Sequence, residues 1–226
     1  MKHQLGILGL GNRSTLYYLN SLNQHYNDLN GGYSTCPYLL LNVDFNTINP
    51  FLPNQFQNII PPLTKYIEQL LKLGAQKILI PNITLHEALD KIEVFDKDLF
   101  IHPLHLLKKE ILLRKEKTTV LIGTRHSMNN PYFNSFINNE GLQIYTLESQ
   151  DQLLVDEFRT AIYHNSESES LINRFESLLS KLEKQYTIIV ACTEISAFYK
   201  TRKVNYKNTL DLALMQIKEA VFQANL

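Results

Sequence analysis

Short apolar runs alternate along the chain with longer segments in which apolar positions recur every three or four residues. The short runs predict buried strands, at residues 4–8, 38–44, 77–80, 99–101, 118–122, 142–145 and 188–191. The longer segments predict helices, at residues 17–22, after the loop of residues 81–86, and at residues 63–73, 102–113, 128–137, 150–163, 167–182 and 209–223. This alternation is typical of an α/β protein whose parallel sheets are covered by helices on both faces.

The pattern of strand ends repeats once along the chain. A strand that ends in Gly9 is followed much later by a strand that ends near Asn82, and Gly123 and Cys192 repeat this order at nearly the same separation. We therefore expect two similar, pseudo-symmetric α/β lobes, with the last helix returning to the first lobe. The expected lobes are residues 1–102 with 208–226, and residues 103–207.

Cys192 is the main candidate for chemistry. The β-branched run 188–191 leads directly to it, so its thiol emerges where a buried strand ends and a loop begins, which is where open α/β sheets place their reactive groups. The other cysteine, Cys36, lies in a Gly/Ser-rich turn region. Two cysteines without paired spacing make a disulfide framework implausible, and we expect a reducing cytoplasm.

The charge balance narrows the class of partner. Lys+Arg and Asp+Glu both number 22, so no basic surplus draws the chain to nucleic acid or to an anionic membrane surface. No apolar run approaches the length of a membrane span. His102 and His105 are three positions apart without a cysteine or carboxylate partner, so we expect no metal site. A small-molecule partner is the prediction.

The glycine loop after the first strand is a weak candidate for cofactor binding. Its backbone amides, next to the positive end of a helix, suit an anion. However, the position three residues after Gly11 is Ser14 rather than glycine, so the dinucleotide-binding pattern is not met. We interpret these glycines as turn residues and expect no cofactor.

Several segments, taken in order, resemble the aspartate/glutamate racemase superfamily. Residues 191–195 (Ala-Cys-Thr-Glu-Ile) are similar to its second-lobe cysteine motif, and residues 123–128 to its Gly-Thr-Arg-Tyr-Thr-Met segment. Residues 6–18 are similar to its N-terminal loop, and residues 42–45 to a Ser-Val-Asp-Phe strand end. The resemblance runs nearly the whole length. It implies a cofactor-independent amino-acid racemase, a site in the cleft between two lobes, and a homodimer.

The first-lobe motif departs from the family pattern. The family has Cys-Asn-Thr-x-His, with threonine in place of that cysteine in one subgroup, where this chain has Asn-Ile-Thr-Leu-His at residues 82–86. Asn82 therefore replaces the first acid/base residue, and Ile83 replaces the usual asparagine. The late Asp-Thr of the family and the histidine after it are matched here by Asn208, Thr209 and Ala213.

A racemase needs two proton-transferring groups on opposite faces of one carbon. Cys192 can supply one of them, whereas the amide of Asn82 has no proton to exchange at neutral pH and could instead donate a hydrogen bond to an enolate or orient a water. The resemblance suggests that Glu194 supports the thiol. We interpret His86 as an orienting or capping residue and His126 as a solvated loop histidine, so neither restores two-sided symmetry.

Hydroxyl groups and backbone amides are expected to hold the substrate carboxylates. The candidate side chains are Ser14, Thr15, Thr84, Thr124, Ser127 and Thr193. Arg125 could add a charge-assisted contact, although a surface arginine explains it equally well. Capping of the following helices is a compatible interpretation for Thr15, Thr84 and Thr209.

Three hypotheses follow from these residues. In the first, the protein is a cytoplasmic racemase of a small amino acid or dicarboxylate, such as aspartate or glutamate. In the second, it is a one-sided enzyme that resembles the arylmalonate decarboxylases, in which a single cysteine delivers one proton to an enolate. In the third, it is a catalytically inactive ligand-binding homologue, because Asn82 stands where the acid/base residue is expected.

Overall fold

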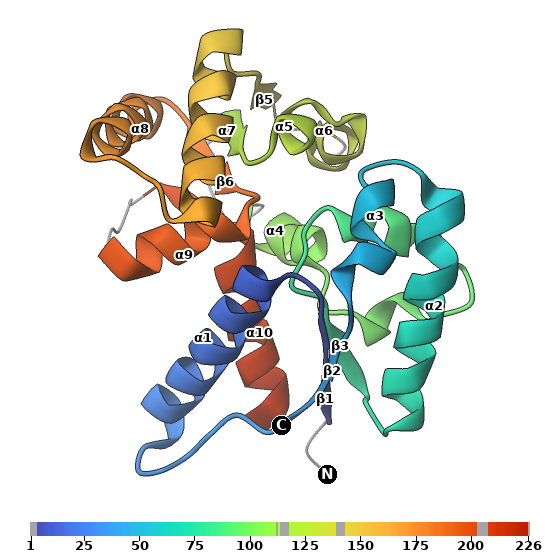
Figure 1. Cartoon of the computed structure of the whole chain (residues 1–226). Helices are drawn as coiled ribbons and strands as arrows, with labels where there is room; N and C mark the ends of the chain where they lie inside the picture. The colour runs from blue at the N-terminus through green and yellow to red at the C-terminus, as the bar shows by residue number, and fades with distance from the viewer. Residues whose placement is uncertain (1–3, 112, 114–117, 139–142, 203–207, 226) are drawn as a thin grey trace. The chain divides into compact units, whose positions relative to one another are not determined.

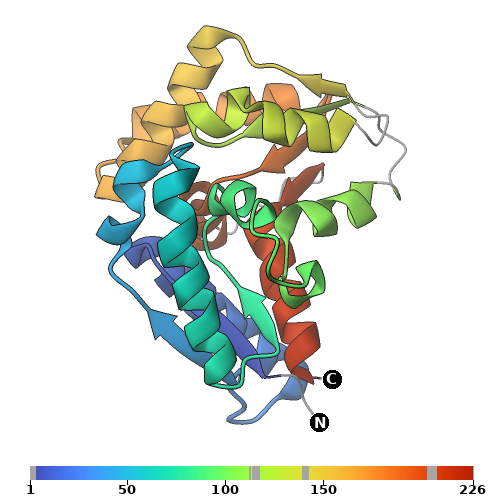
Figure 2. The same ribbon diagram turned by 90° about the vertical axis from the view of Figure 1, so that its right-hand side faces the viewer.

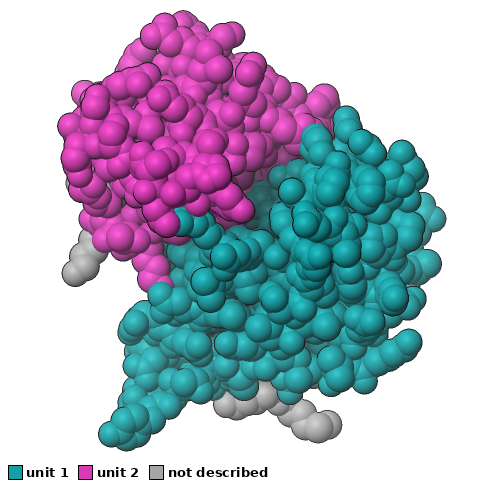
Figure 3. All heavy atoms as spheres, in the orientation of Figure 1, with its two compact units in different colours: residues 1–103, 214–226 teal, residues 104–213 magenta. Residues whose placement is uncertain are grey.

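The computed structural model describes residues 4–111, 113, 118–138, 143–202 and 208–225. These residues form two parallel sheets, with strand orders β2-β1-β3 and β5-β4-β6-β7, and helices pack on both (Figure 1). This confirms the predicted α/β class. The chain divides into two compact units, residues 1–103 with 214–226 (unit 1) and residues 104–213 (unit 2), which Figure 3 colours separately.

Unit 1 is built on the three-stranded sheet. Its main elements are β1 (Leu5–Gly9), α1 (Asn12–Asn30), β2 (Tyr38–Asn42), α2 (Phe56–Lys72), β3 (Lys77–Leu79), α3 (Leu85–Asp90) and most of α10 (Leu212–Asn225). The central strand β1 is buried along its whole length and pairs in parallel with both neighbours. Helices α1 and α10 cover one face of the sheet, and α2 covers the other (Figures 1 and 2).

The sequence predicts a helix that starts at Leu63, directly after the prolines at 61–62. Helix α2 starts at Phe56 instead, so both prolines lie inside it. A proline inside a helix leaves the carbonyl four residues earlier without its usual partner. The residues that carry these carbonyls, 57–58, are exposed, so water can take the place of the missing N–H groups. The apolar stripe that faces the core is Ile59, Leu63, Ile67 and Leu70.

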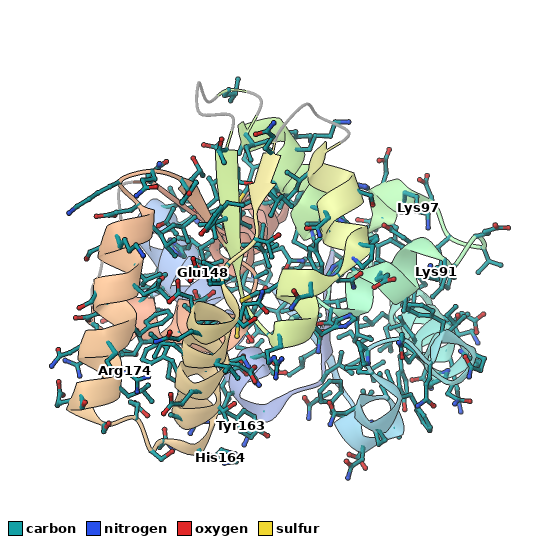
Figure 4. The ribbon with its side chains drawn as sticks, turned by 90° about the horizontal axis from the view of Figure 1, so that it is seen from above. Lys91, Lys97, Glu148, Tyr163, His164 and Arg174 are labelled. Atoms are coloured by element: carbon teal, nitrogen blue, oxygen red, sulfur yellow. The ribbon has the colours of Figure 1, made fainter. Side chains whose placement is uncertain are left out.

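The C-terminal end of α3 is closed by a lysine from outside the helix. Lys97 Nζ donates to the carbonyl oxygens of Leu89 (3.3 Å), Asp90 (2.9 Å) and Ile92 (3.0 Å). A cation at this end of a helix is favourable, because the last carbonyls have no partner within the helix. Lys97 is labelled in Figure 4. It anchors the short helix that follows residues 82–84.

Unit 2 is built on the four-stranded sheet. Its elements are α4 (Pro103–Ile111), β4 (Thr118–Ile122), α5 (Arg125–Asn129), α6 (Pro131–Asn138), β5 (Gln143–Tyr145), α7 (Ser149–His164), α8 (Glu169–Leu182), β6 (Thr187–Val190), α9 (Thr193–Arg202) and β7 (Thr209–Asp211). Strand β6 is completely buried between β4 and β7. The ring of Phe158 on α7 stacks on Phe175 of α8 (centroids 3.8 Å apart) and meets Phe198 of α9 edge-on (4.9 Å).

The prediction of one helix over 209–223 was wrong at its start. Residues 209–211 form β7, which pairs in parallel with β6, and α10 begins only at Leu212. The cause is local capping, since Asp211 Oδ1 accepts the backbone N–H of Ala213 at 2.9 Å. A residue that caps the start of a helix has an extended backbone, so Asp211 can end β7 and start α10.

Two further predicted elements differ from the structure. Residues 97–99 form a 3₁₀ turn, and of the strand predicted at 99–101 only Phe100 makes a bridge, to Ile78. The helix predicted over 128–137 is two helices, α5 and α6, because Pro131 starts the second one. Leu112 of the predicted helix and Leu142 of the predicted strand lie outside the described residues. No helix in the described ranges is long and apolar enough to cross a lipid bilayer.

Candidate active site

Cys192 lies at the carboxyl end of β6, as the apolar run before it predicts. The sheet pairing continues one residue past the strand, because Ala191 N donates to Ile122 O at 2.8 Å. Gly123 sits against the same backbone, and a Cβ at this position would lie 3.1 Å from Ala191 O. The ends of β4 and β6 therefore approach closely enough that a side chain at position 123 would crowd them. Cys192 is 5% exposed and directly precedes α9.

The Cys192 thiol donates a hydrogen bond to a carboxylate. Its Sγ lies 3.0 Å from Glu194 Oε2, and the hydroxyl of Thr193 donates to the same oxygen at 3.3 Å. Burial raises the pKa of Cys192 well above its ordinary value, and the negative charge of Glu194 adds to this effect, while the backbone of Ile195 and the Arg159 cation oppose it. The resting thiol is therefore protonated, with a proton acceptor in contact with it.

The loop after β4 is held by its own hydroxyl groups. Thr124 caps α5 by accepting the N–H of Ser127 at 3.0 Å, and the two side-chain oxygens are 2.9 Å apart. Ser127 is buried and Arg125 is exposed. His126 Nε2 lies 2.9 Å from the amide nitrogen of Asn130, so it is bonded within its own loop and is only half exposed to solvent. The sequence interpretation of His126 as a solvated residue is corrected in this respect.

Sequence reasoning missed Asp211 and Ser196. Ser196 Oγ donates to Asp211 Oδ1 at 2.8 Å and also lies 3.1 Å from the carbonyl oxygen of Cys192. Asp211 pairs in register with Val190 at the end of the neighbouring strand. The carboxylate of Asp211 therefore fixes the first turn of α9, which carries Glu194. The signal that could have found it is an aspartate that ends an apolar-containing strand and precedes a helix.

Asn208, which the sequence matches to the family's late aspartate, binds to the start of β6. It precedes β7, where its Nδ2 donates to Tyr186 O at 2.9 Å and its Oδ1 accepts from Thr187 Oγ1 at 3.0 Å. These partners lie at the amino end of β6, away from Cys192. Thr209, expected as a helix cap, lies inside β7. The aspartate nearest to this segment, Asp211, ends β7.

In unit 1 the glycine loop after β1 is closed by internal bonds. Thr15 Oγ1 accepts the N–H of Leu10 at 3.1 Å, and Ser14 Oγ donates to Gly11 O at 3.3 Å. Thr15 lies within α1 and is 5% exposed. The capping interpretation of Thr15 is therefore corrected: its hydroxyl binds the turn before the helix from a position inside the helix.

Asn82, not Thr84, caps α3. Asn82 Oδ1 accepts the N–H of Leu85 at 3.1 Å, whereas the side chain of Thr84 makes no capping bond. The backbone of Thr84 is already helical, and a capping side chain needs an extended backbone to reach the first turn. Among the described residues, Asn82 Nδ2 and Thr84 Oγ1 have no hydrogen-bond partner. These two donors are thus available to a ligand.

His86 is neutral and turned toward its own loop. It is 1% exposed, and burial lowers its pKa to about 3, with the neighbouring His102 lowering it further. Its Nδ1 lies 2.9 Å from the carbonyl oxygen of Asn82. A carbonyl only accepts, so Nδ1 carries the proton. This agrees with an orienting role, and the histidine next to the Asn82 carbonyl is neutral at pH 7.

His102, at the end of the first segment of unit 1, and His105, at the start of unit 2, contact other side chains. His102 Nε2 lies 3.4 Å from Asp90 Oδ1, and its ring meets that of His86 edge-on at 4.8 Å. His105 stacks on the ring of Phe136 in unit 2. Across the part of the chain that the structure describes, no three histidine, cysteine or acidic side chains gather into a group that could hold a metal ion.

Comparison with known proteins shows which solved structures share the fold of this chain. No protein-family model matches the chain, and no curated protein matches its sequence. A candidate Asp/Glu racemase from Yersinia pestis matches with a TM-score of 0.83 at 24% identity, covering 99% of this chain and 100% of its own. The Picrophilus torridus aspartate racemase matches with a TM-score of 0.74 at 16% identity over 100% of both chains.

A glutamate racemase from Francisella tularensis, solved in complex with D-glutamate, extends the comparison. It matches with a TM-score of 0.62 at 14% identity, covering 96% of this chain and 79% of its own. This chain has the fold of the aspartate/glutamate racemases. The resemblance predicted from the order of the sequence motifs is confirmed at the level of the fold.

Proposed function

We propose that this protein transfers protons at the α-carbon of a small amino acid carboxylate of the aspartate or glutamate class, without a cofactor. The observation that carries the proposal is the Cys192 thiol, held at the carboxyl end of β6 with its Sγ 3.0 Å from Glu194 Oε2, in a fold shared with aspartate and glutamate racemases. A buried thiol held in contact with a carboxylate is the arrangement that the proposed proton transfer explains.

The proposed chemistry uses only residues of this chain. The Cys192 proton moves to Glu194, which leaves a thiolate and a neutral carboxylic acid. The thiolate then removes the α-proton of the substrate, and the resulting enolate is reprotonated either by the Cys192 thiol on the same face or by a water molecule on the opposite face. Because burial raises the pKa of Cys192, the thiolate is a strong base once it forms. The substrate carboxylates are assigned to the remaining candidates, Ser14, Thr84, Thr124, Arg125, Ser127 and Thr193.

A second candidate function is one-sided proton transfer, as in a decarboxylase or isomerase of the same fold. The specific observation in its favour is Asn82, whose Oδ1 is engaged by Leu85 N while its Nδ2 stays available. An amide donor can stabilise an enolate but cannot exchange a proton with it. In this case Cys192 alone delivers the proton. The expectation that the substrate lies between the two lobes stays a prediction under either function.

Deuterium incorporation separates these functions. The purified protein is incubated in deuterated water with each enantiomer of aspartate and glutamate, and α-deuterium and optical purity are followed together. Exchange with loss of optical purity supports racemisation. Exchange on one enantiomer alone, or release of carbon dioxide from an arylmalonate, supports the one-sided reaction.

The third hypothesis, an inactive ligand-binding homologue, predicts a different outcome. Calorimetry would then detect binding of an amino acid or dicarboxylate, while no deuterium enters any substrate. Turnover that is unaltered in Cys192→Ala would contradict both catalytic functions, because each assigns the proton transfer to this thiol.

We also propose a homodimer that works in the cytoplasm. The resemblance to the racemases supports the dimer, and a catalytic thiol that must stay reduced supports the compartment. Sedimentation equilibrium tests the first point. A mass near that of a single 26.2 kDa chain would contradict the dimer.

A further inference from the structure

A buried glutamine on the C-terminal helix contacts the His86 side chain. Gln216 is 0% exposed and lies on α10 within unit 1. Its Oε1 accepts from the hydroxyl of Tyr18, also completely buried, at 2.7 Å. Its Nε2 donates to the carbonyl oxygen of Ile101 at 2.6 Å and lies 3.4 Å from His86 Nε2. Gln216 thus joins four segments that are far apart in the sequence.

The orientation of this amide follows from its partners. The carbonyl of Ile101 can only accept, so the nitrogen of Gln216 must face it and the oxygen must face Tyr18. The second N–H of the same nitrogen is then directed at His86. Because Nδ1 of His86 already donates to Asn82 O, Nε2 is the acceptor of the pair. The contacts of Gln216 and Asn82 together select one neutral tautomer of His86.

The same contacts continue to the candidate site. His86 holds the backbone carbonyl of Asn82, and the side chain of Asn82 caps α3 through Leu85. Both bonds act on one residue, so the direction of the Asn82 Nδ2 donors depends on where His86 lies. A buried polar network of this kind orders its members strongly when every partner is satisfied.

We propose that Gln216 is a positioning residue for the loop of residues 82–86. From α10 it fixes the ring and the tautomer of His86, which in turn fixes Asn82 so that its Nδ2 faces the substrate anion. The assignment of a substrate rests on the proposed function. The fixed tautomer of His86 does not depend on the proposed function, since it follows from the hydrogen bonds within unit 1.

The test replaces Gln216 by an apolar residue of similar length. Gln216→Met removes all three hydrogen bonds, and Gln223→Met is the matched control, because Gln223 lies on the same helix and donates only to Glu219 (2.7 Å). Tyr18→Phe, which removes one hydroxyl, serves as the milder variant should Gln216→Met fail to fold. Histidine side-chain ¹H–¹⁵N spectra report the tautomer, and steady-state kinetics report KM and kcat.

We expect the His86 Nε2 resonance to move downfield in Gln216→Met, as an acceptor nitrogen does when it loses its donor, and to stay in place in Gln223→Met. We expect KM to rise about fivefold, the equivalent of one buried hydrogen bond, with kcat nearly unchanged. A wild-type His86 spectrum in Gln216→Met overturns the proposal, as does a fall in kcat at constant KM. If the wild-type protein turns over no substrate, the proposed function fails, and the His86 spectrum still decides the positioning role.

Discussion

The carboxyl ends of β6 and β3 present two related loops with different chemistry. In unit 2 the strand ends at a protonated thiol in contact with a carboxylate, and helix α9 follows at once. In unit 1 the strand is followed by Asn82, whose side chain caps its own helix, and by His86, which is neutral and turned back onto the loop. Both loops therefore position a polar side chain where a strand ends and a helix begins.

The difference between them lies in which atoms are committed. On the Cys192 side the thiol proton is donated to Glu194. On the Asn82 side the carbonyl oxygen is used for capping, the backbone oxygen is used by His86, and only amide hydrogens remain available. The same backbone arrangement carries a thiol in contact with a carboxylate in one unit and a fixed amide in the other. The choice is made by the side chain, not by the fold.

The largest expected effect is at the thiol. Cys192→Ala should lower α-deuterium exchange about a thousandfold, the range in which a positioned acid or base contributes. Cys36→Ala is the matched control: this second buried cysteine has a pKa raised to about 11 by burial and lies outside the proposed chemistry. Equal loss in both variants, measured by exchange at matched helical content, would remove the distinction between the two strand ends.

Glu194→Gln should have the next largest effect. Removing its charge lowers the pKa of Cys192, since that charge is among the causes that raise it. We expect faster alkylation of the thiol by iodoacetamide at pH 8 and, at the same time, about a hundredfold slower α-proton exchange, because the proton acceptor is gone. Glu93→Gln, at an exposed position, is the control. Slower alkylation would contradict the assigned electrostatic role.

His86 should make the stability of unit 1 depend on pH. Its pKa is about 3 in the folded chain against 6.5 in the unfolded one, so the unfolded state binds more protons between these values and stability falls as the pH drops through this window. Between pH 7 and pH 5 the loss is about 2 kcal/mol. Urea unfolding of the native chain and of His86→Gln at both pH values measures it. An identical loss in the two proteins would show that His86 is not buried in its neutral form.

Asn82→Cys sharpens the comparison directly. It gives unit 1 a group that exchanges protons, and we expect racemisation to rise about tenfold. It also removes the cap on α3, which costs about 1 kcal/mol of stability. Asn82→Ala loses the same cap without gaining a thiol and is therefore the control. Optical rotation is the measurement, and equal rates in the two variants would show that a thiol at position 82 does not reach the substrate.

Much of the fold follows from local pattern. The alternation of short apolar runs and amphipathic segments predicted the α/β class, and the buried run 188–191 predicted that Cys192 ends a strand. Prediction failed where local rules compete with each other. The prolines at 61–62 suggested a helix start, but they lie inside α2. The three residues of β7 were predicted as part of a helix, because a strand this short shows no alternation of apolar and polar positions that could distinguish it from the amphipathic segment beside it.

Hydrogen-bonding partners were the least predictable feature of the candidate site. The hydroxyl groups of Thr15, Thr84 and Thr209 were all interpreted as possible helix caps, yet the caps are Asn82 and Asp211. Capping depends on whether a residue's backbone is extended at that point, and this is set by the strand that precedes it.

The sequence by itself determined which residues can do chemistry: a single thiol after a buried strand, a carboxylate two positions later, and an amide where an acid/base residue is expected. These are properties of side-chain type and of short-range pattern. Only the tertiary structure decided that Asp211 and Ser196 fix the helix after Cys192, and that Gln216 and Tyr18 hold His86. Some of those contacts join residues that lie nearly at opposite ends of the chain, such as Tyr18 and Gln216. No local pattern encodes a hydrogen bond whose partners meet only after folding.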